Sequence, residues 1–161
     1  MPITPFHFGL GLAAKAALER RFSLVLFVAL QVVTDIESLY NLTYHREPVH
    51  RHLHTFLGAT VLALLISTLL HGTLRWWDAR HGRIERRPYA PVLATALFAT
   101  WSHVLLDGVM HTDTRPLWPL TDFNPLLAVV RVDTLHLACL ALGFFGLVAL
   151  AFQWSLRDRD A

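Results

Sequence analysis

Hydrophobic residues form four long runs along this chain, separated by polar connections. Three of the runs, 53–74, 90–106 and 135–156, contain no Asp, Glu, Lys or Arg. A fourth, 22–34, is uncharged for 13 residues before the chain reaches Asp35. A helix that crosses the hydrocarbon core of a bilayer needs roughly 20 mostly apolar residues. The pattern therefore predicts four transmembrane helices.

A shorter apolar segment precedes these runs. The distance along it from its histidine to its last basic residue resembles the distance along the next segment from its first basic residue to its acid. His7 and Arg20 are 13 residues apart, and Arg21 and Asp35 are 14 apart, so each pair spans about 20 Å of helix. If both helices start from the turn between them, His7 and Asp35 reach a similar depth. We expect a short N-terminal helix packed in the membrane within the bundle.

Composition supports the membrane class. Of the 161 residues, 54% are hydrophobic and only 16% are charged, which is too apolar for an ordinary soluble domain. The alternative is a soluble all-helical protein with a large core. Cys139 is the single cysteine, so no disulfide framework is expected. We predict one domain over 1–161, an all-α integral membrane bundle of four long transmembrane helices plus a shorter N-terminal helix.

Basic residues are concentrated in segments that this pattern puts on one side of the membrane. Five arginines lie within 75–87, three basic residues within 15–21, and two arginines after position 156. Lys and Arg are enriched in cytoplasmic connections. We therefore predict a multi-pass membrane protein with a cytoplasmic C-terminus. The arginines suit lipid headgroups better than nucleic acid.

Histidines and acids recur at a spacing of four residues in two places. In "SHVLLDGVMH" the polar residues are His103, Asp107 and His111, which share one stripe of a helix. In "HRHLHT" the pair is His50 and His54. If this segment is helical too, each of the two stretches can chelate an ion.

Under the predicted topology, eight such side chains from four segments reach the outer half of the bilayer. Lone charges there are costly, so these groups pair, line water or bind metal. Asp35 and Glu37 are about 200° apart on an ideal helix, so one of them can be a ligand while the other orients a ligand histidine. The candidate metal ligands are His7, Asp35, Glu37, His50, His54, His103, Asp107 and His111.

The other histidines have simpler explanations. We expect His71, His81 and His136 to make packing contacts, and His45 and His52 to lie in a loop. Imidazole and carboxylate ligands without a thiolate favour zinc, with manganese or iron as alternatives. The number of candidate ligands allows one or two ions.

The chain resembles a known family at these residues. The matching stretches are "TPFHFGLGL", "TDIES", "HRHLHTFLG" and "SHVLLDGVMHTDTRPLWP". They are similar, in order, to the early histidine, the D-x-D/E motif, the H-R-x-x-x-H-[ST] stretch and the H-x-x-x-D-x-x-x-H helix with a Leu-Trp-Pro turn of the YdjM family of inner-membrane, metal-dependent hydrolases. The resemblance implies metal and catalytic roles for the eight candidate residues. Here Glu37 stands where many members have Asp, and His50 and His54 are four rather than five apart.

These observations predict a membrane-embedded metal-dependent hydrolase. Its expected substrate is a phosphate ester or phosphodiester of a lipid or lipid-linked molecule, attacked by a metal-activated water. The candidate catalytic residues are Asp35, Glu37 and Asp107. The main alternative is a metal-binding transporter or sensor without chemistry, and a metal that only holds helices together is another. An intramembrane protease is disfavoured because H-E-x-x-H is missing. The segment 111–132 is expected to be either a lid or a loop packed on the bundle rim.

Overall fold

The computed structural model describes residues 5–83 and 87–159, so Arg86 of the arginine-rich connection lies outside it. Within these ranges every regular element is a helix. The order is η1 (Pro5–His7), α1 (Phe8–Leu18), η2 (Glu19–Arg21), α2 (Leu24–Thr43), α3 (Phe56–Arg80), α4 (Tyr89–Met110) and α5 (Val132–Arg159). The helices α2 to α5 are each long and apolar enough to cross a membrane, which confirms the predicted fold class.

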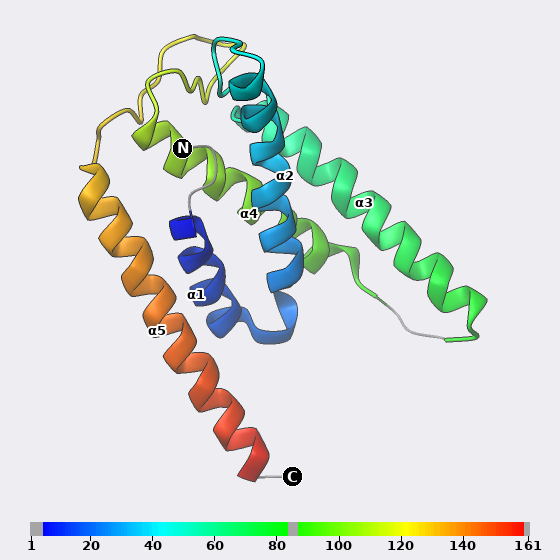
Figure 1. Cartoon of the computed structure of the whole chain (residues 1–161). Helices are drawn as coiled ribbons and strands as arrows, with labels where there is room; N and C mark the ends of the chain where they lie inside the picture. Colours follow the sequence, from blue (N-terminus) through cyan, green and yellow to red (C-terminus); the bar gives the residue numbers. More distant parts are fainter. Residues whose placement is uncertain (1–4, 84–86, 160–161) are drawn as a thin grey trace.

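The bundle is arranged around α4. It packs against α3 on one side and α2 on the other, while α1 lies against α2 and along α5 (Figure 1). The short N-terminal helix is therefore inside the bundle, as predicted. Large apolar side chains on α3 and α5 point outwards, for example Leu65, Phe144 and Phe145, which are all more than half exposed. Such surfaces fit a lipid environment better than water.

Two helices begin at side-chain caps. The hydroxyl of Ser23 accepts a hydrogen bond from the Leu26 amide at the start of α2, and that of Thr55 accepts one from the Gly58 amide at the start of α3. Both residues are preferred N-caps. Because α3 begins only at Phe56, the segment with His50 and His54 is not helical, and the helical spacing considered for this pair does not apply. The two histidines lie in the loop that connects α2 and α3.

Glycines allow α1 and α5 to pack closely. A side chain at Gly9 would collide with the carbonyl oxygen of Cys139, and one at Gly146 would collide with the backbone of Leu12 and Ala13. Small residues permit this approach between membrane helices. The contact holds α1, and the His7 that precedes it, at a fixed position along α5.

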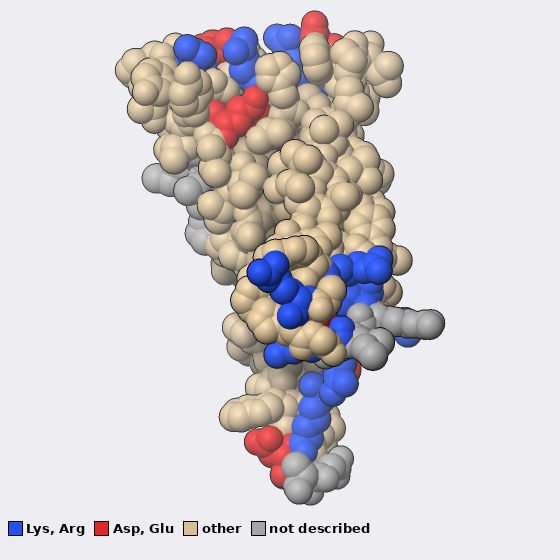
Figure 2. Space-filling view, turned by 90° about the vertical axis from the view of Figure 1, so that its right-hand side faces the viewer, with Lys and Arg blue, Asp and Glu red and all other residues tan. Residues whose placement is uncertain are grey.

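The two ends of the bundle differ in their residues. At one end, here called the loop end, the connections 44–55 and 111–131 lie together (Figure 1). The opposite, basic end contains the turn between α1 and α2, the last turns of α3, the start of α4 and the C-terminal turns of α5. Figure 2 shows Lys and Arg gathered over this basic end.

Candidate metal centre

A buried cluster of histidines and carboxylates surrounds Asp107 of α4 at the loop end. The Oδ2 atom of Asp107 lies 3.2 Å from His54 Nε2 and 3.3 Å from His103 Nε2. Its Oδ1 atom lies 3.5 Å from His7 Nε2. One carboxylate therefore faces histidines from the N-terminal segment, the α2–α3 loop and its own helix.

Asp35 of α2 completes the cluster from the other side. Its Oδ1 atom is 3.3 Å from His103 Nε2 and 3.8 Å from His54 Nε2. One ligand atom from each of Asp35, His54, His103 and Asp107 lies within 4.8 Å of the other three, and none of these residues is more than 3% exposed. The four residues are thus close enough to share one ion.

Buried atoms of the cluster that lack a hydrogen bond indicate whether a cation fits there. His7 Nε2, Asp35 Oδ1, His50 Nε2 and His103 Nε2 are buried, and none has a hydrogen bond of acceptable geometry among the described residues. Such atoms are costly unless something binds them. Burial alone lowers the pKa of His54, but the neighbouring carboxylates of Asp107 and Asp35 outweigh it and raise that pKa above its usual value. The pocket therefore favours positive charge, and these residues can hold a metal ion.

A second group of possible ligands adjoins the first. One atom each from His50, His111 and Asp113 lies within 4.8 Å of the other two. The rings of His50 and His111 stack at 4.2 Å, and their Nε2 atoms are each 3.9 Å from an oxygen of Asp107. Burial lowers the pKa of His111 below its ordinary value, which favours the neutral, ligating form. Asp107 thus lies between the two groups.

Two residues that the sequence did not single out orient the histidines. Gln31 Oε1 lies 2.7 Å from His103 Nδ1, and Asp113 Oδ1 lies 2.9 Å from His50 Nδ1. Each contact leaves the Nε2 atom facing the cluster. Gln31 could have been found from its position four residues before Asp35, on the same face of α2. Asp113 follows α4 in a loop, where no periodic pattern marks it.

The structure does not bring Glu37 into the cluster. α2 continues as a regular helix to Thr43, so Glu37 points away from the side on which Asp35 lies. Its Oε2 accepts from the Leu53 amide at 2.7 Å, and its Oε1 accepts from the His52 amide at 3.2 Å and also contacts the His52 ring. Glu37 therefore holds the loop that carries His50 and His54.

Asp113 holds the same loop from the opposite side. Its Oδ2 accepts from the amides of Val49 and His50. Burial tends to raise the pKa of this carboxyl, but the hydrogen bonds from the His50 amide and ring and from Val49 outweigh it and keep the pKa below its usual value. The side chains of Glu37 and Asp113, rather than a helix, therefore hold the loop in the conformation that brings His50 and His54 together.

The segment after α4 packs on the rim of the bundle. Asn124 Nδ2 donates to the carbonyl oxygen of Gly108 at 2.8 Å, and the Ala128 amide donates to that of Val109. The Phe56 amide donates to the carbonyl oxygen of Pro116 at 2.8 Å, which ties the segment to α3. These bonds match the rim-packing alternative.

The remaining histidines lie away from the cluster. His71 bonds the carbonyl oxygen of Arg87, and His81 bonds that of Trp77. The His136 ring stacks on Phe6 at 4.1 Å. These contacts are the packing interactions that the spacing of these residues predicted.

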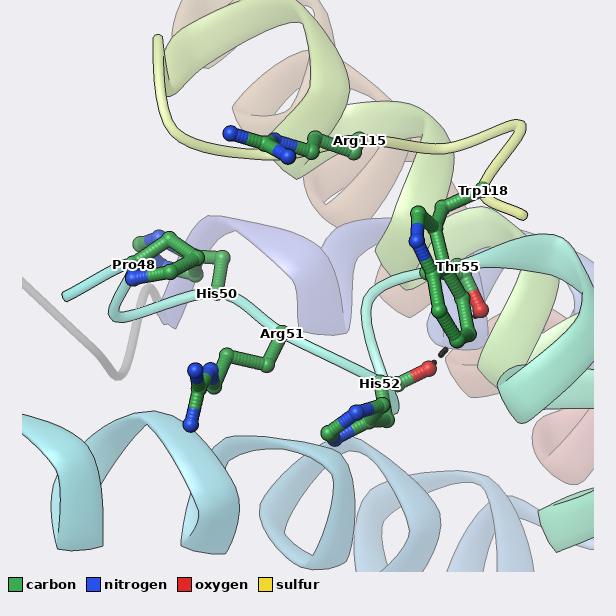
Figure 3. A pocket seen from close by; sticks show the side chains of 7 residues that line it. All are labelled: Pro48, His50, Arg51, His52, Thr55, Arg115 and Trp118. Carbon is green, nitrogen blue, oxygen red and sulfur yellow. Dashed lines mark hydrogen bonds between the residues drawn. The ribbon is translucent and has the colours of Figure 1, made fainter. Parts of the chain in front are cut away.

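A pocket opens beside the cluster at the loop end (Figure 3). Arg115 and Trp118 lie on one wall and face the loop that carries Arg51 and His52. His50 belongs both to this pocket and to the second ligand group. The lining of the pocket therefore includes two arginines beside one candidate metal ligand, His50. Its lining residues are Pro48, His50, Arg51, His52, Thr55, Arg115 and Trp118.

Comparison of the chain with family models, with curated proteins and with solved structures finds no match. The similarity to the YdjM family therefore stays a prediction from the four sequence motifs.

Proposed function

We propose that the chain is a membrane-embedded metal-dependent hydrolase that acts on a phosphate ester or phosphodiester of a lipid or lipid-linked substrate. The observation that carries the proposal is the convergence of buried imidazole nitrogens from three separate segments on both oxygens of Asp107, with Asp35 beside them. The set contains more potential ligand atoms than hydrogen bonds of good geometry can use, as expected of a site for a cation. The similarity of the motifs to those of the YdjM hydrolases supports the same activity.

The first ion would be held by Asp35, His54, His103 and Asp107, and His7, His50 and His111 border the same space. Imidazole and carboxylate donors suit zinc, and manganese or iron is the alternative. A divalent ion bound there would polarise a phosphoryl oxygen and make a bound water more acidic. The second oxygen of Asp107, Oδ1, is directed at His7 and His111. This arrangement supports binding of a second ion next to the first.

We assign the two buried acids different roles. Asp107 has histidines facing both of its oxygens and holds the cluster together. Asp35 would offer Oδ1, the oxygen that faces His103 and His54, to the ion, and its other carboxylate oxygen would accept the proton of the attacking water. The Glu37 carboxylate is bound to the loop backbone, so in this proposal it takes no part in proton transfer.

The pocket at the loop end supports a phosphate-bearing substrate. Arg51 and Arg115 line it (Figure 3), and guanidinium groups bind phosphate oxygens with paired hydrogen bonds. Arg115 also pairs with Asp122 at 2.6 Å, which holds its side chain at the pocket. Trp118 offers an apolar surface for the part of the substrate that adjoins the phosphate. We further propose that this end faces outwards and that the basic end faces the cytoplasm.

The test is phosphate release by purified, zinc-loaded protein from a panel of phospholipids and lipid-linked phosphates. We expect turnover by the unchanged chain and a loss of at least about 100-fold in Asp35→Asn, because general-base catalysis contributes roughly 100–10,000-fold. Glu37→Gln serves as the matched control and should retain turnover. Asp35→Asn must still bind zinc for the comparison to hold, and Asp35→Glu gives a second variant that keeps the charge.

Two outcomes would overturn the proposal. One is zinc-loaded, folded protein that releases no phosphate from any member of the panel. The other is zinc movement across reconstituted vesicles without hydrolysis, which would favour the transporter alternative.

A further inference from the structure

A groove between α2 and α3 opens at the basic end of the bundle. α3 packs along α4 but diverges from α2 towards this end, and residues of α4 line the groove between them (Figure 1). The turn before α2 supplies the rim. The groove shares no lining residue with the metal cluster or with the pocket at the loop end.

Leucine, proline and valine side chains make up the apolar part of the groove, and His71 and Arg87, which also line it, are joined by a hydrogen bond from the His71 ring to the Arg87 carbonyl oxygen. Leu26 of α2 is buried, and Leu70 and Leu74 of α3 and Val92 of α4 are half-buried. The polar atoms of the floor bond each other, since the Ser23 amide donates to the hydroxyl of Thr95, which itself donates to a backbone carbonyl. The interior of the groove therefore suits hydrocarbon rather than a polar ligand.

The rim of the groove carries excess positive charge. Arg20 and Arg21 are both exposed there. The nearby Glu19 pairs with Arg157 at 2.9 Å, and Asp78 is bound by Arg87. None of the ion pairs between described residues involves Arg20 or Arg21. Glu19 and Asp78 are thus bound by other arginines, and the guanidinium groups of Arg20 and Arg21 remain at the rim of the groove.

We propose that this groove binds an anionic phospholipid, with its phosphate at Arg20 and Arg21 and an acyl chain along Leu26, Leu70, Leu74 and Val92. Charge complementarity selects the occupant, because a zwitterionic lipid brings no net charge to the two arginines. The apolar walls explain why the ligand is a lipid rather than a free anion. A lipid in this position would fill the space between α2 and α3, which make little direct contact there.

The proposal can be tested by native mass spectrometry of the full chain after incubation with mixed vesicles of phosphatidylglycerol and phosphatidylcholine. We expect one phosphatidylglycerol to be retained in preference to phosphatidylcholine. The double variant Arg20→Gln, Arg21→Gln should reduce that retention roughly 30-fold, as expected for the loss of about 1 kcal/mol for each of two arginines near a lipid surface. Arg75→Gln, Arg80→Gln is the matched control, since it removes two exposed arginines of the same end that do not line the groove.

A second variant tests the groove itself. Leu74→Trp fills the channel without changing its charge and should also displace the retained lipid, even if the double arginine variant fails to fold. Equal loss in the two arginine double variants would overturn the proposal, because it would indicate general attraction to a basic surface. Equal retention of phosphatidylcholine, or full retention by Leu74→Trp, would overturn it as well. None of these outcomes depends on hydrolysis or metal binding.

Discussion

Buried carboxylates lie at both ends of the bundle, and they are satisfied in different ways. At the basic end, Asp78 is bound by two nitrogens of Arg87. At the loop end, Asp107 faces five histidines, and four of these have a buried ring nitrogen without a hydrogen bond among the described residues. Arginine can only donate, whereas neutral histidine also offers a lone pair. The first acid is therefore paired within the chain, and the second is part of a site with ligand atoms to spare.

The largest expected effect follows from replacing each acid by its amide. Asp107→Asn removes a charge that two ligand groups share, and we expect its zinc affinity to fall more than roughly 100-fold, beyond the loss typical of residues that only orient a ligand. Asp78→Asn should retain its zinc. Elemental analysis after dialysis against buffered zinc measures both. Equal zinc contents in the two variants would remove the distinction between the ends.

Removing the metal should destabilise the loop end. A ligand present at about 100 times its dissociation constant stabilises the folded state by about 2.7 kcal/mol, so chelation should lower the Tm by roughly 5–10 °C for a chain of this size. Thermal unfolding in detergent, with and without a chelator, provides the measurement. Asp107→Asn should show no response to the chelator. A similar Tm shift in that variant would mean that the metal acts elsewhere.

A smaller effect is expected at Gln31, which orients His103. We expect Gln31→Leu to weaken zinc binding roughly 10–100-fold, the range typical of residues that orient a ligand histidine, while saturating zinc still fills the site. Gln153→Leu is a matched control, because Gln153 also donates to a backbone carbonyl but lies near the basic end. Zinc titration with a competing chelator separates the two. Equal affinities would show that Gln31 is only a packing residue.

Glu37 is expected to affect stability rather than metal binding. Glu37→Gln leaves weaker acceptors for the amides of His52 and Leu53, at a cost of about 1–3 kcal/mol in the free energy of unfolding. Denaturant unfolding and zinc analysis on the same sample check this. Loss of zinc with unchanged stability would contradict the observed contacts and return Glu37 to the list of ligands.

The smallest predicted effect is a pH dependence at Asp113. Its pKa lies below the usual value in the folded chain, so its stabilising contribution is complete at neutral pH and disappears as the pH falls below about 4 and through the folded value. The difference in Tm between the unchanged chain and Asp113→Asn should be largest near pH 7 and shrink in acid. A difference that grows in acid would have the wrong sign.

Local patterns predicted the parts of the molecule that depend on local geometry. The apolar runs gave the transmembrane helices, and the four-residue spacing put His103 and Asp107 on one face of α4. The spacing of Asp35 and Glu37 indicated that both acids could bind one ion only on a distorted helix, and α2 is regular at these residues.

The loop end could not be predicted in this way. His50 and His54 are four apart but not helical, because Thr55 starts α3 after them and Glu37 and Asp113 fix the loop from other segments. These are contacts across more than ten residues of sequence, and a spacing rule carries no information about them. Asp113 was missed for the same reason, since its role is visible only once the two loops lie together.

The glycine contact between α1 and α5 links the metal cluster to a helix that, among the described residues, supplies no side chain to it. His7 directly precedes α1, and α1 lies as close to α5 as it does because Gly9 and Gly146 have no side chains there. A bulkier residue at either position would therefore withdraw one imidazole from the cluster while leaving the other ligands in place. The packing of α5 on α1 therefore sets the position of His7, and a substitution at this contact should weaken metal binding at a cluster to which α5 itself supplies no ligand among the described residues.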